Sequence, residues 1–337
     1  MKNILINIIV LTFSLITVEF GLRWTGLLLT SMENNGGEHV AQFNEKRETW
    51  FFTWTPNTTV NYEQDEFNYE YKINEWGNRE KSISFFLENK DKDVVKIVCL
   101  GDSFTEGDGA PYDSTWVRYL EKALNNQNKN SYKLYNAGNS GSDIFYNYIQ
   151  LKERLLNIRP EYVIELINDS DIKDVVYAGG LERFNDDGTV TYKTGRKWER
   201  LYINSHLFRL FVRVFFGYDD LIMKDKEKLD AVDKIIRQAK KTQELCDSNG
   251  IKYFLFFHIT PQNIRNKTPY ETILLHQKID SLPFAISLKE KMINKFDKLD
   301  YINYSWEKNY HFNSYGYWEM GKFIYEKLRE KDEKIIQ

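Results

Sequence analysis

The stretch that decides the fold runs Lys96-Ile97-Val98-Cys99-Leu100-Gly101-Asp102-Ser103-Phe104-Thr105-Glu106-Gly107. Its first half belongs to a short apolar run, residues 94–100, that stops at a glycine, as buried β-strands commonly do. Gly101 permits a tight turn, so Ser103 is expected at the top of a sheet, where backbone amides can face a developing oxyanion. Ser103 is therefore a candidate nucleophile. Taken alone, the tripeptide fits an ordinary turn equally well.

Strands and helices alternate from about residue 94 to residue 330. Strands are expected at 94–100, 132–136, 162–167, 251–259 and 301–304, and helices at 114–124, 143–158, 225–249, 287–299 and 314–330. This alternation predicts an α/β fold, a three-layer α/β/α sandwich with a mostly parallel five-stranded sheet and right-handed crossovers. Residues 172–224 interrupt the pattern and are expected to form an insertion. Ligands of such sheets bind at the carboxyl ends of the strands.

Three further segments follow predicted strands or precede a helix at the same edge of the sheet. Gly141 can offer a backbone N–H at a helix N-terminus, and Asn168 can donate from its side chain, both to an oxyanion. A flexible loop and an Asx turn are the alternatives for these two positions. His311 precedes the last helix, where it could reach Ser103. The sequence contains four other histidines, which are less well placed: His39, His206, His258 and His276.

The N-terminus carries the one strong targeting signal. Lys2 precedes an apolar run, residues 4–22, in which Asn7 and Glu19 are the only strongly polar residues. About 20 apolar residues span a bilayer. Because no small-residue cleavage site and no lipobox cysteine are evident, we favour an uncleaved signal anchor over a cleaved signal peptide. Lys2 favours an N-terminus inside the cell and a main domain outside the cytoplasm.

Composition excludes several classes of function. The 337 residues carry a net charge of −3, which gives no basic signature for nucleic acid. Cys99 and Cys246 are too few for a disulfide framework and are expected to be buried, inert thiols. No metal-ligand spacing and no glycine-rich phosphate loop is evident, so we expect neither a metal nor another cofactor. We expect a membrane anchor over residues 1–29, an aromatic-rich stalk or packing segment over 30–92, and the main domain over 93–332.

Taken together and in order, these segments resemble the SGNH (GDSL-type) hydrolase superfamily over about residues 94–330. Gly101-Asp102-Ser103 matches the first block, and Gly141, Asn168 and His311 match the later ones. The N-terminal anchor and residues 73–79 resemble a membrane-anchored branch of that superfamily. The resemblance implies a flavodoxin-like SGNH fold. It also implies that Ser103 attacks an ester carbonyl and His311 takes its proton, while the Ser103 and Gly141 amides and the Asn168 side chain hold the oxyanion.

One departure from the family concerns the residue that orients the histidine. The family usually carries an aspartate two or three residues before it, where this chain has Asn309 and Lys308, with Glu307 one residue further back. Asn309 could orient the imidazole ring, Glu307 could bend in, or a backbone carbonyl could serve. The absence of the aspartate leaves a weakened or inactive member as a possibility.

The resemblance implies a serine esterase, deacylase or O-acyltransferase that acts on ester-linked acyl groups. An acylated carbohydrate of the cell envelope, or another small ester, is the expected substrate, with acetyl among the expected acyl groups. Nothing in the residues separates hydrolysis from transfer. The alternative is a catalytically inactive SGNH-fold protein that binds glycans or serves in envelope assembly, suggested by the missing aspartate and the aromatic-rich segment.

Overall fold

The structure, a computed structural model, describes residues 2–30, 46–47, 54–88, 94–127, 131–191, 195–266, 268–332 and 335. The chain divides into two compact units. Unit 1 consists of Met1–Glu48 and Val176–Lys228, and unit 2 consists of Thr49–Val175 and Leu229–Gln337. Part of the predicted stalk segment, residues 50–53 among it, lies outside the described residues.

Unit 2 is built on a parallel five-stranded sheet in the order β5-β4-β6-β8-β9, counted over the described residues. Its strands are β4 (Val94–Gly101), β5 (Ser131–Asn136), β6 (Tyr162–Asn168), β8 (Lys252–His258) and β9 (Ala285–Ser287). The predicted α/β class and parallel sheet are confirmed. Because β5 and β6 flank β4 on opposite sides, the strand order reverses beside β4, and this is the edge at which doubly wound sheets bind ligands.

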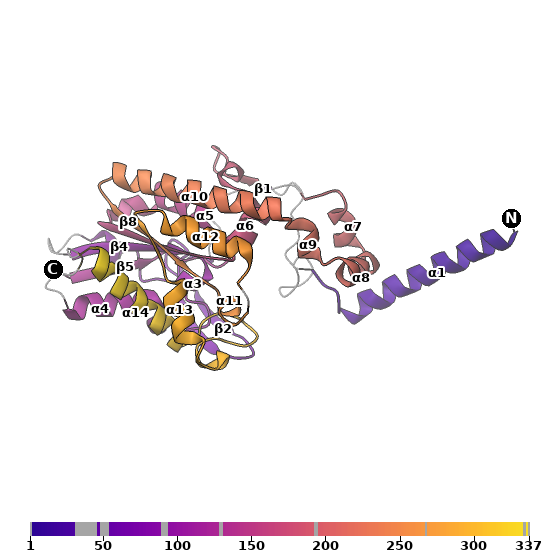
Figure 1. Cartoon of the computed structure of the whole chain (residues 1–337), viewed down its shortest axis with the longest axis horizontal. Helices are drawn as coiled ribbons and strands as arrows, with labels where there is room; N and C mark the ends of the chain where they lie inside the picture. Colours follow the sequence, from indigo (N-terminus) through magenta and orange to yellow (C-terminus); the bar gives the residue numbers. More distant parts are fainter. Residues whose placement is uncertain are drawn as a thin grey trace. The chain divides into compact units, whose positions relative to one another are not determined.

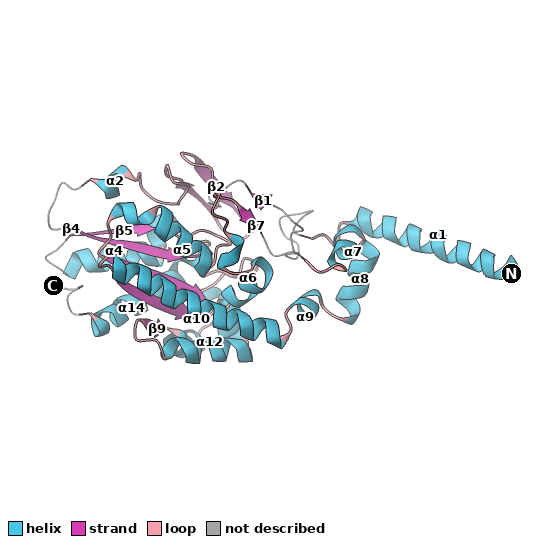
Figure 2. Ribbon diagram, turned by 90° about the horizontal axis from the view of Figure 1, so that it is seen from above, coloured by secondary structure: helices cyan, strands magenta, loops and turns pink. Residues whose placement is uncertain are grey.

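Helices cover both faces of this sheet (Figures 1 and 2). On one face lie α4 (Trp116–Gln127) and α14 (Ser314–Lys331), which pack against each other, and on the other lie α5 (Ile144–Glu153) and α10 (Asp225–Ser248). Since neither face of the central strands meets water, most of their side chains are apolar and do not alternate with polar ones, and every residue of β6 is buried. Further helical elements are α2 (Ser84–Leu87), α3 (Ser103–Glu106), η1 (Tyr112–Ser114), η2 (Leu155–Ile158), α6 (Asp171–Ala178), α11 (Pro261–Arg265), α12 (Tyr270–Asp280), α13 (Lys289–Phe296) and η4 (Tyr301–Asn303).

The prediction of a strand at residues 301–304 is wrong. The chain forms the 3₁₀ turn η4 there, and the fifth strand of the sheet is β9, which lies earlier in the chain. The aromatic residues of this stretch pack as a turn, with the Tyr304 ring stacked on Phe296 at a centroid distance of 4.4 Å. A three-residue strand carries too little periodicity to be recognised in the sequence, so β9 was not predicted.

A β-hairpin precedes the sheet in unit 2. Strands β2 (Thr59–Glu63) and β3 (Asn68–Lys72) pair antiparallel, with Tyr62 opposite Tyr69. The rings of Tyr62, Phe67, Tyr69 and Tyr71 contact one another at centroid distances of 5.4 to 6.2 Å. Such aromatic pairs stabilise a hairpin that would be marginal alone.

Unit 1 contains the N-terminal helix α1 (Lys2–Thr25), none of whose residues is buried. Within the described part of the chain it is the one helix long and apolar enough to cross a membrane, a property shared by membrane anchors and signal sequences. The other elements of unit 1 are η3 (Leu181–Arg183), α7 (Glu199–Asn204), α8 (His206–Phe215), α9 (Tyr218–Ile222) and the short antiparallel pair β1 (Lys46–Arg47) and β7 (Val190–Thr191). Most of the predicted insertion, residues 172–224, falls in this unit.

Candidate active site

Ser103 stands where β4 turns into α3. The turn requires a glycine, because Gly101 has a φ of 153° and a Cβ there would lie 2.1 Å from Thr105 Oγ1. The Asp102 carboxylate caps α3 by accepting a hydrogen bond from the Phe104 amide at 2.9 Å. Ser103 is the first residue of the helix, so its N–H has no partner within the helix.

His311 contacts this serine. Its Nε2 lies 2.8 Å from Ser103 Oγ, and its ring packs against Phe104 at a centroid distance of 4.8 Å. Tyr310, the residue before it, has a φ of 67°, a left-handed conformation that is unusual for a bulky side chain. The backbone is thus strained at the position that turns the imidazole toward Ser103.

The other ring nitrogen of His311 faces two acceptors of one residue. Nδ1 lies 2.7 Å from Asn309 Oδ1 and 3.1 Å from the Asn309 carbonyl oxygen. Two acceptors require a proton on Nδ1, which leaves Nε2 free to accept one from Ser103. Of the two predicted orienting residues, Asn309 therefore contacts the ring. For Glu307, the contact recorded among the described residues is made by its backbone amide.

Asp108 also faces His311, and sequence reasoning missed it. Its Oδ2 lies 3.9 Å from His311 Nδ1, and no described residue donates a hydrogen bond to its buried Oδ1. Both backbone polar groups of Asp108 are hydrogen-bonded. Its amide donates to the Ser103 carbonyl at 2.9 Å, and its carbonyl accepts from Tyr317 Oη at 2.7 Å. The only signal in the sequence is Gly107, whose φ of 91° turns the chain back toward the site.

A second missed residue, Glu66, lies in the turn of the β2–β3 hairpin. Its carboxylate accepts hydrogen bonds from three consecutive backbone amides, those of Glu307 and Lys308 at 2.8 Å and that of Asn309 at 3.0 Å. The Lys308 side chain points to the surface and pairs with Asp65 at 2.8 Å. The hairpin therefore holds the segment that presents Asn309 and His311.

Asn168 ends β6, the strand next to β4. Its Nδ2 donates to Asp102 Oδ2 at 2.7 Å, and its Oδ1 accepts from the Ser170 amide at 2.8 Å. A carboxamide nitrogen carries two hydrogens, and the contact with Asp102 uses one of them. The Asn168 amide donates to Asp171 at 2.8 Å, and burial together with the nearby Asp102 carboxylate raises the pKa of Asp171 well above its usual value.

Gly141 lies in the loop after β5, on the other side of β4. It adopts a φ of 77°, and no described acceptor pairs with its backbone N–H. The neighbouring Ser140 amide donates to Glu106 at 2.7 Å, and the Trp54 indole N–H donates to the same carboxyl group at 2.7 Å. Burial raises the pKa of Glu106 to about 7. Glu106 thus ties the Gly141 loop to α3, the helix that begins with Ser103.

His258, which ends β8, is a structural residue. It is fully buried, its Nδ1 lies 3.1 Å from the Ile259 carbonyl oxygen, and burial lowers its pKa to about 3. It therefore stays neutral beneath Phe104, whose ring it meets at a centroid distance of 4.7 Å. Cys99 and Cys246 are buried free thiols. Among the described residues no group of three acidic, cysteine or histidine side chains is placed to hold a metal ion.

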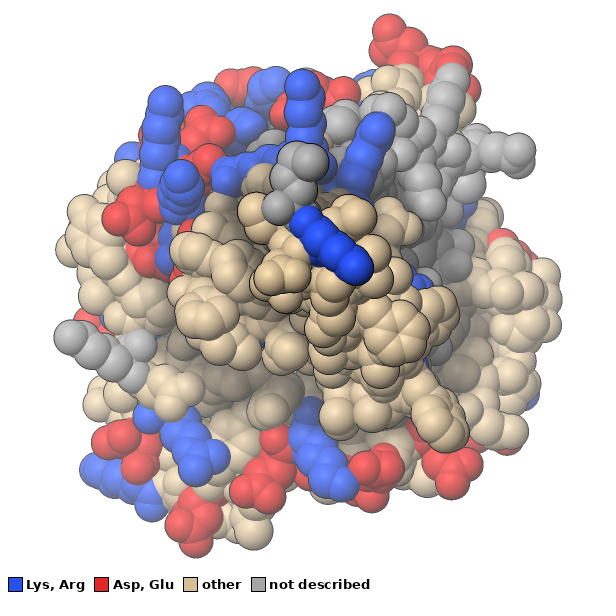
Figure 3. Space-filling model, turned by 90° about the vertical axis from the view of Figure 1, so that its right-hand side faces the viewer, with Lys and Arg blue, Asp and Glu red and all other residues tan. Residues whose placement is uncertain are grey.

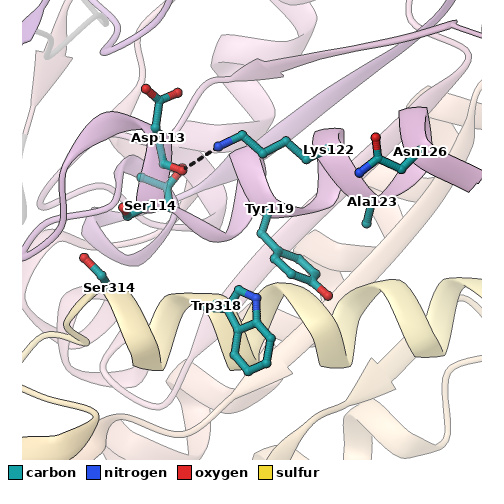
Figure 4. A pocket seen from close by; sticks show the side chains of 9 residues that line it. Asp113, Ser114, Tyr119, Lys122, Ala123, Asn126, Ser314 and Trp318 are labelled. Carbon is teal, nitrogen blue, oxygen red and sulfur yellow. Dashed lines mark hydrogen bonds between the residues drawn. The ribbon is translucent and has the colours of Figure 1, made fainter.

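Figure 4 shows a hollow between α4 and α14 that is separate from the Ser103–His311 pair. Its volume is about 470 Å³, and Tyr119 and Trp318 form its aromatic wall. Lys122 Nζ donates across its rim to the Asp113 carbonyl at 3.2 Å. Because neither Ser103 nor His311 lines this hollow, it is not the candidate active site.

No family model and no curated protein sequence matches the chain. Among solved structures it is similar to a two-domain esterase active on acetylated mannans, with 11% identity and a TM-score of 0.42 over 72% of this chain, and it spans 51% of that protein's length. It is also similar to an acetylxylan esterase from Geobacillus stearothermophilus, with 13% identity and a TM-score of 0.44 over 73% of this chain and 99% of that one. A lipase from a goat rumen metagenome has 13% identity and a TM-score of 0.45, over 68% of this chain and 95% of that one.

The parallel sheet brings the four sequence blocks to one edge. Ser103, Gly141 and Asn168 follow three neighbouring strands, and His311 meets Ser103 from the loop before α14. The chain thus has a parallel α/β fold that brings to one edge of the sheet the four blocks by which its sequence resembles the SGNH (GDSL-type) hydrolases.

Proposed function

We propose that the protein is a serine esterase or deacylase that removes acyl groups from hydroxyls. The observation that carries this proposal is the 2.8 Å contact between His311 Nε2 and Ser103 Oγ, with the opposite ring nitrogen held by Asn309. A nucleophile, a base within hydrogen-bond reach and a group that orients the base are the minimum for covalent catalysis by serine.

In the proposed reaction Ser103 Oγ attacks the carbonyl carbon of the ester, and its proton passes to His311 Nε2. The negative charge on the carbonyl oxygen is stabilised by the Ser103 and Gly141 amides and by the second N–H of Asn168. His311 then protonates the departing alcohol, which leaves an acyl group on Ser103. A water molecule attacks this acyl-serine, His311 takes the water proton, and the same proton returns to Ser103 Oγ as the acid is released.

Asn309 and Asp108 divide the work that one aspartate performs in the usual family pattern. Asn309 accepts the Nδ1 hydrogen and so sets the tautomer and the ring direction. The Asp108 carboxylate, 3.9 Å from Nδ1, supplies negative charge next to the imidazolium that forms during the reaction. Burial and the same carboxylate raise the pKa of Tyr62, whose hydroxyl therefore stays protonated and donates to Asp108 Oδ2 at 3.3 Å.

The proposed substrate is an acylated carbohydrate of the cell envelope, with acetyl as the acyl group. One support is the resemblance in sequence. The other is α1, because a membrane anchor with Lys2 inside the cell would hold the enzyme at the outer face of the membrane that it crosses. If a sugar hydroxyl replaces water in the second step, the same residues perform O-acyl transfer. The division into an anchor, an aromatic-rich segment and a hydrolase domain is part of this proposal.

The test uses the full-length protein in detergent with p-nitrophenyl acetate. Replacing Ser103 by alanine (Ser103→Ala) should lower kcat/KM by at least ~10³-fold, and a fluorophosphonate probe should label the wild type but not the variant. Ser248→Ala, which changes an exposed serine at the end of α10, is the matched control and should keep full activity. Equal rates for wild type and Ser103→Ala would overturn the esterase and leave the inactive, glycan-binding alternative.

A further inference from the structure

Helix α8 in unit 1 exposes several large apolar side chains near its C-terminal end, while Arg209 is turned inward. Phe211, Val214 and Phe215 are 47%, 63% and 68% exposed, whereas Arg209 is fully buried. A surface helix in water shows the opposite distribution. The exposed rings also gather, since Phe215 and Phe216 lie 5.1 and 5.6 Å from Phe211 between ring centroids. A contiguous apolar patch of this kind marks a contact with something other than water.

The inward arginines of α8 attach it to the end of α1. Arg209 Nη1 donates to the Leu28 carbonyl at 2.6 Å, and Arg213 Nη2 donates to the Leu29 carbonyl at 3.1 Å. From the other side, the Arg23 guanidinium donates to the carbonyl of Asn204. The carbonyls beyond the last turn of α1 are thus satisfied by α8, and the two helices form one body within unit 1.

Glu19 of α1 fixes the position at which α8 begins. Its carboxylate accepts hydrogen bonds from the His206 and Leu207 amides at 3.0 and 2.8 Å and from Ser205 Oγ at 3.0 Å. The N-terminus of α8 therefore lies level with Glu19. At ~1.5 Å per residue, Glu19 is ~23 Å along the axis from Ile4, the start of the apolar run. A hydrocarbon core of ~30 Å that begins near Ile4 would end ~7 Å beyond Glu19, so the start of α8 would lie within the ~5–10 Å depth to which interfacial helices are buried.

We infer that the outward face of α8, made of Phe211, Val214, Phe215 and Phe216, inserts into the lipid surface of the membrane that α1 crosses. An amphipathic helix rests at the boundary between headgroups and acyl chains, which is the level that Glu19 gives to α8. Lipid is the occupant that continuity favours, because α8 packs directly against α1, an apolar helix none of whose residues is buried. Figure 3 looks along α1 from its N-terminal end, and the side chains drawn along this helix are mostly uncharged. The inference rests on the anchor role of α1 and is independent of the esterase reaction.

The consequence is a two-point attachment of unit 1. A single spanning helix lets the segment behind it rotate freely about the helix axis. A second contact, made by a helix that is hydrogen-bonded to the first, removes this rotation and gives unit 1 a fixed orientation on the bilayer.

Spin labels on the full-length protein test this inference. The Phe215→Cys variant carries a nitroxide label and is placed in nanodiscs of phosphatidylethanolamine and phosphatidylglycerol. The two native cysteines are buried, so the wild type treated with the same reagent gives the background labelling. The matched control is Asp220→Cys, an exposed polar position on α9. We expect the Phe215 label to be relaxed more by oxygen than by a water-soluble nickel complex, and the Asp220 label to show the reverse.

Two results would overturn the lipid contact. One is a Phe215 label as accessible to the nickel complex as the Asp220 label, which means that the face stays in water. The other is a Phe215 label that neither reagent reaches and whose EPR spectrum is broadened by a neighbouring label, which means that a second copy of the chain covers this face. Val214→Cys on the same face gives an independent reading if the Phe215 variant fails to fold, and it should match the pattern expected for Phe215.

Discussion

The two halves of the candidate site are held in different ways. Ser103, Gly141 and Asn168 stand at the ends of three neighbouring strands, so the backbone pairing of β5, β4 and β6 places them. His311 belongs to no strand of the sheet. Its segment is held by the Glu66 carboxylate from the hairpin turn, and its ring by Asn309 and Asp108. The comparison teaches that the position of Ser103, the proposed nucleophile, depends on a cooperative sheet. The position of His311, the proposed base, depends on a few separate polar contacts that can be removed one at a time.

The largest effect is expected from Asn309. Asn309→Ala removes the side-chain acceptor of the His311 Nδ1 hydrogen, and loss of the orienting group can cost up to ~10⁴ in turnover, so we expect kcat to fall by ~10²- to 10⁴-fold. Steady-state kinetics with p-nitrophenyl acetate measures it. Asn309→Asp keeps the acceptor and should stay within about ten-fold of the wild type. An alanine variant with wild-type turnover would show that the backbone carbonyl alone orients the ring.

A smaller loss is expected from Asp108→Asn, which keeps shape and removes charge. A full imidazolium at 3.9 Å would interact with Asp108 by about 4 kcal/mol at an effective dielectric constant of about 20. The side chains are 20% and 12% exposed, and water weakens the interaction further, so we expect kcat to fall by ~10- to 100-fold while KM is unchanged. The control is Asp113→Asn, an exposed position in η1. A rise in KM without a fall in kcat would assign Asp108 to substrate binding instead.

Glu66→Gln tests whether the β2–β3 hairpin keeps the segment before His311 in position. A neutral amide replaces a carboxylate that accepts from three amides, and charge-assisted hydrogen bonds exceed neutral ones by about 1 kcal/mol, so we expect kcat to fall by about three- to ten-fold. Lys308→Ala, in the same segment, removes only an exposed ion pair and should leave kcat unchanged. If both variants behave alike, the segment does not depend on Glu66.

No change in activity is expected from Glu165→Gln, which lies within the sheet in β6, the strand that ends at Asn168. Its effect should instead be on stability. Burial raises the pKa of Glu165 to about 7, although Tyr253 and Asn147 donate hydrogen bonds to it. A raised pKa means that the folded state binds a proton more tightly than the unfolded one. The stabilising contribution is therefore complete below about pH 4.5 and is lost as the pH rises through 7, a change of up to about 3 kcal/mol.

Denaturant unfolding of the full-length protein in detergent at pH 5 and pH 8 measures this contribution. The wild type should be less stable at pH 8, with part of the difference owed to Glu106, whose pKa is also raised to about 7. Glu165→Gln should narrow the difference between the two pH values. An unchanged difference would exclude Glu165 as its source.

Much of the fold could be predicted because it depends on local pattern. The apolar runs that end at Gly101 and Asn168 predict buried strands, and their alternation with helices predicts a parallel sheet. The error at residues 301–304 arose where the pattern was shortest, since a 3₁₀ turn and a short strand place their aromatic residues alike.

The residues of the candidate site that follow strands were predictable from the same local pattern. Ser103, Gly141, Asn168 and His311 stand in order along the chain, and the sequence by itself determined that the first three follow strands and therefore share an edge. Only the tertiary structure decided what supports the base. Asn309 was one of several open choices, Asp108 was marked only by the glycine before it, and Glu66 carried no local signal. Their roles depend on a turn that folds back beside Ser103 and on a hairpin more than two hundred residues before His311. Contacts between distant segments depend on three-dimensional packing, which no local periodicity records.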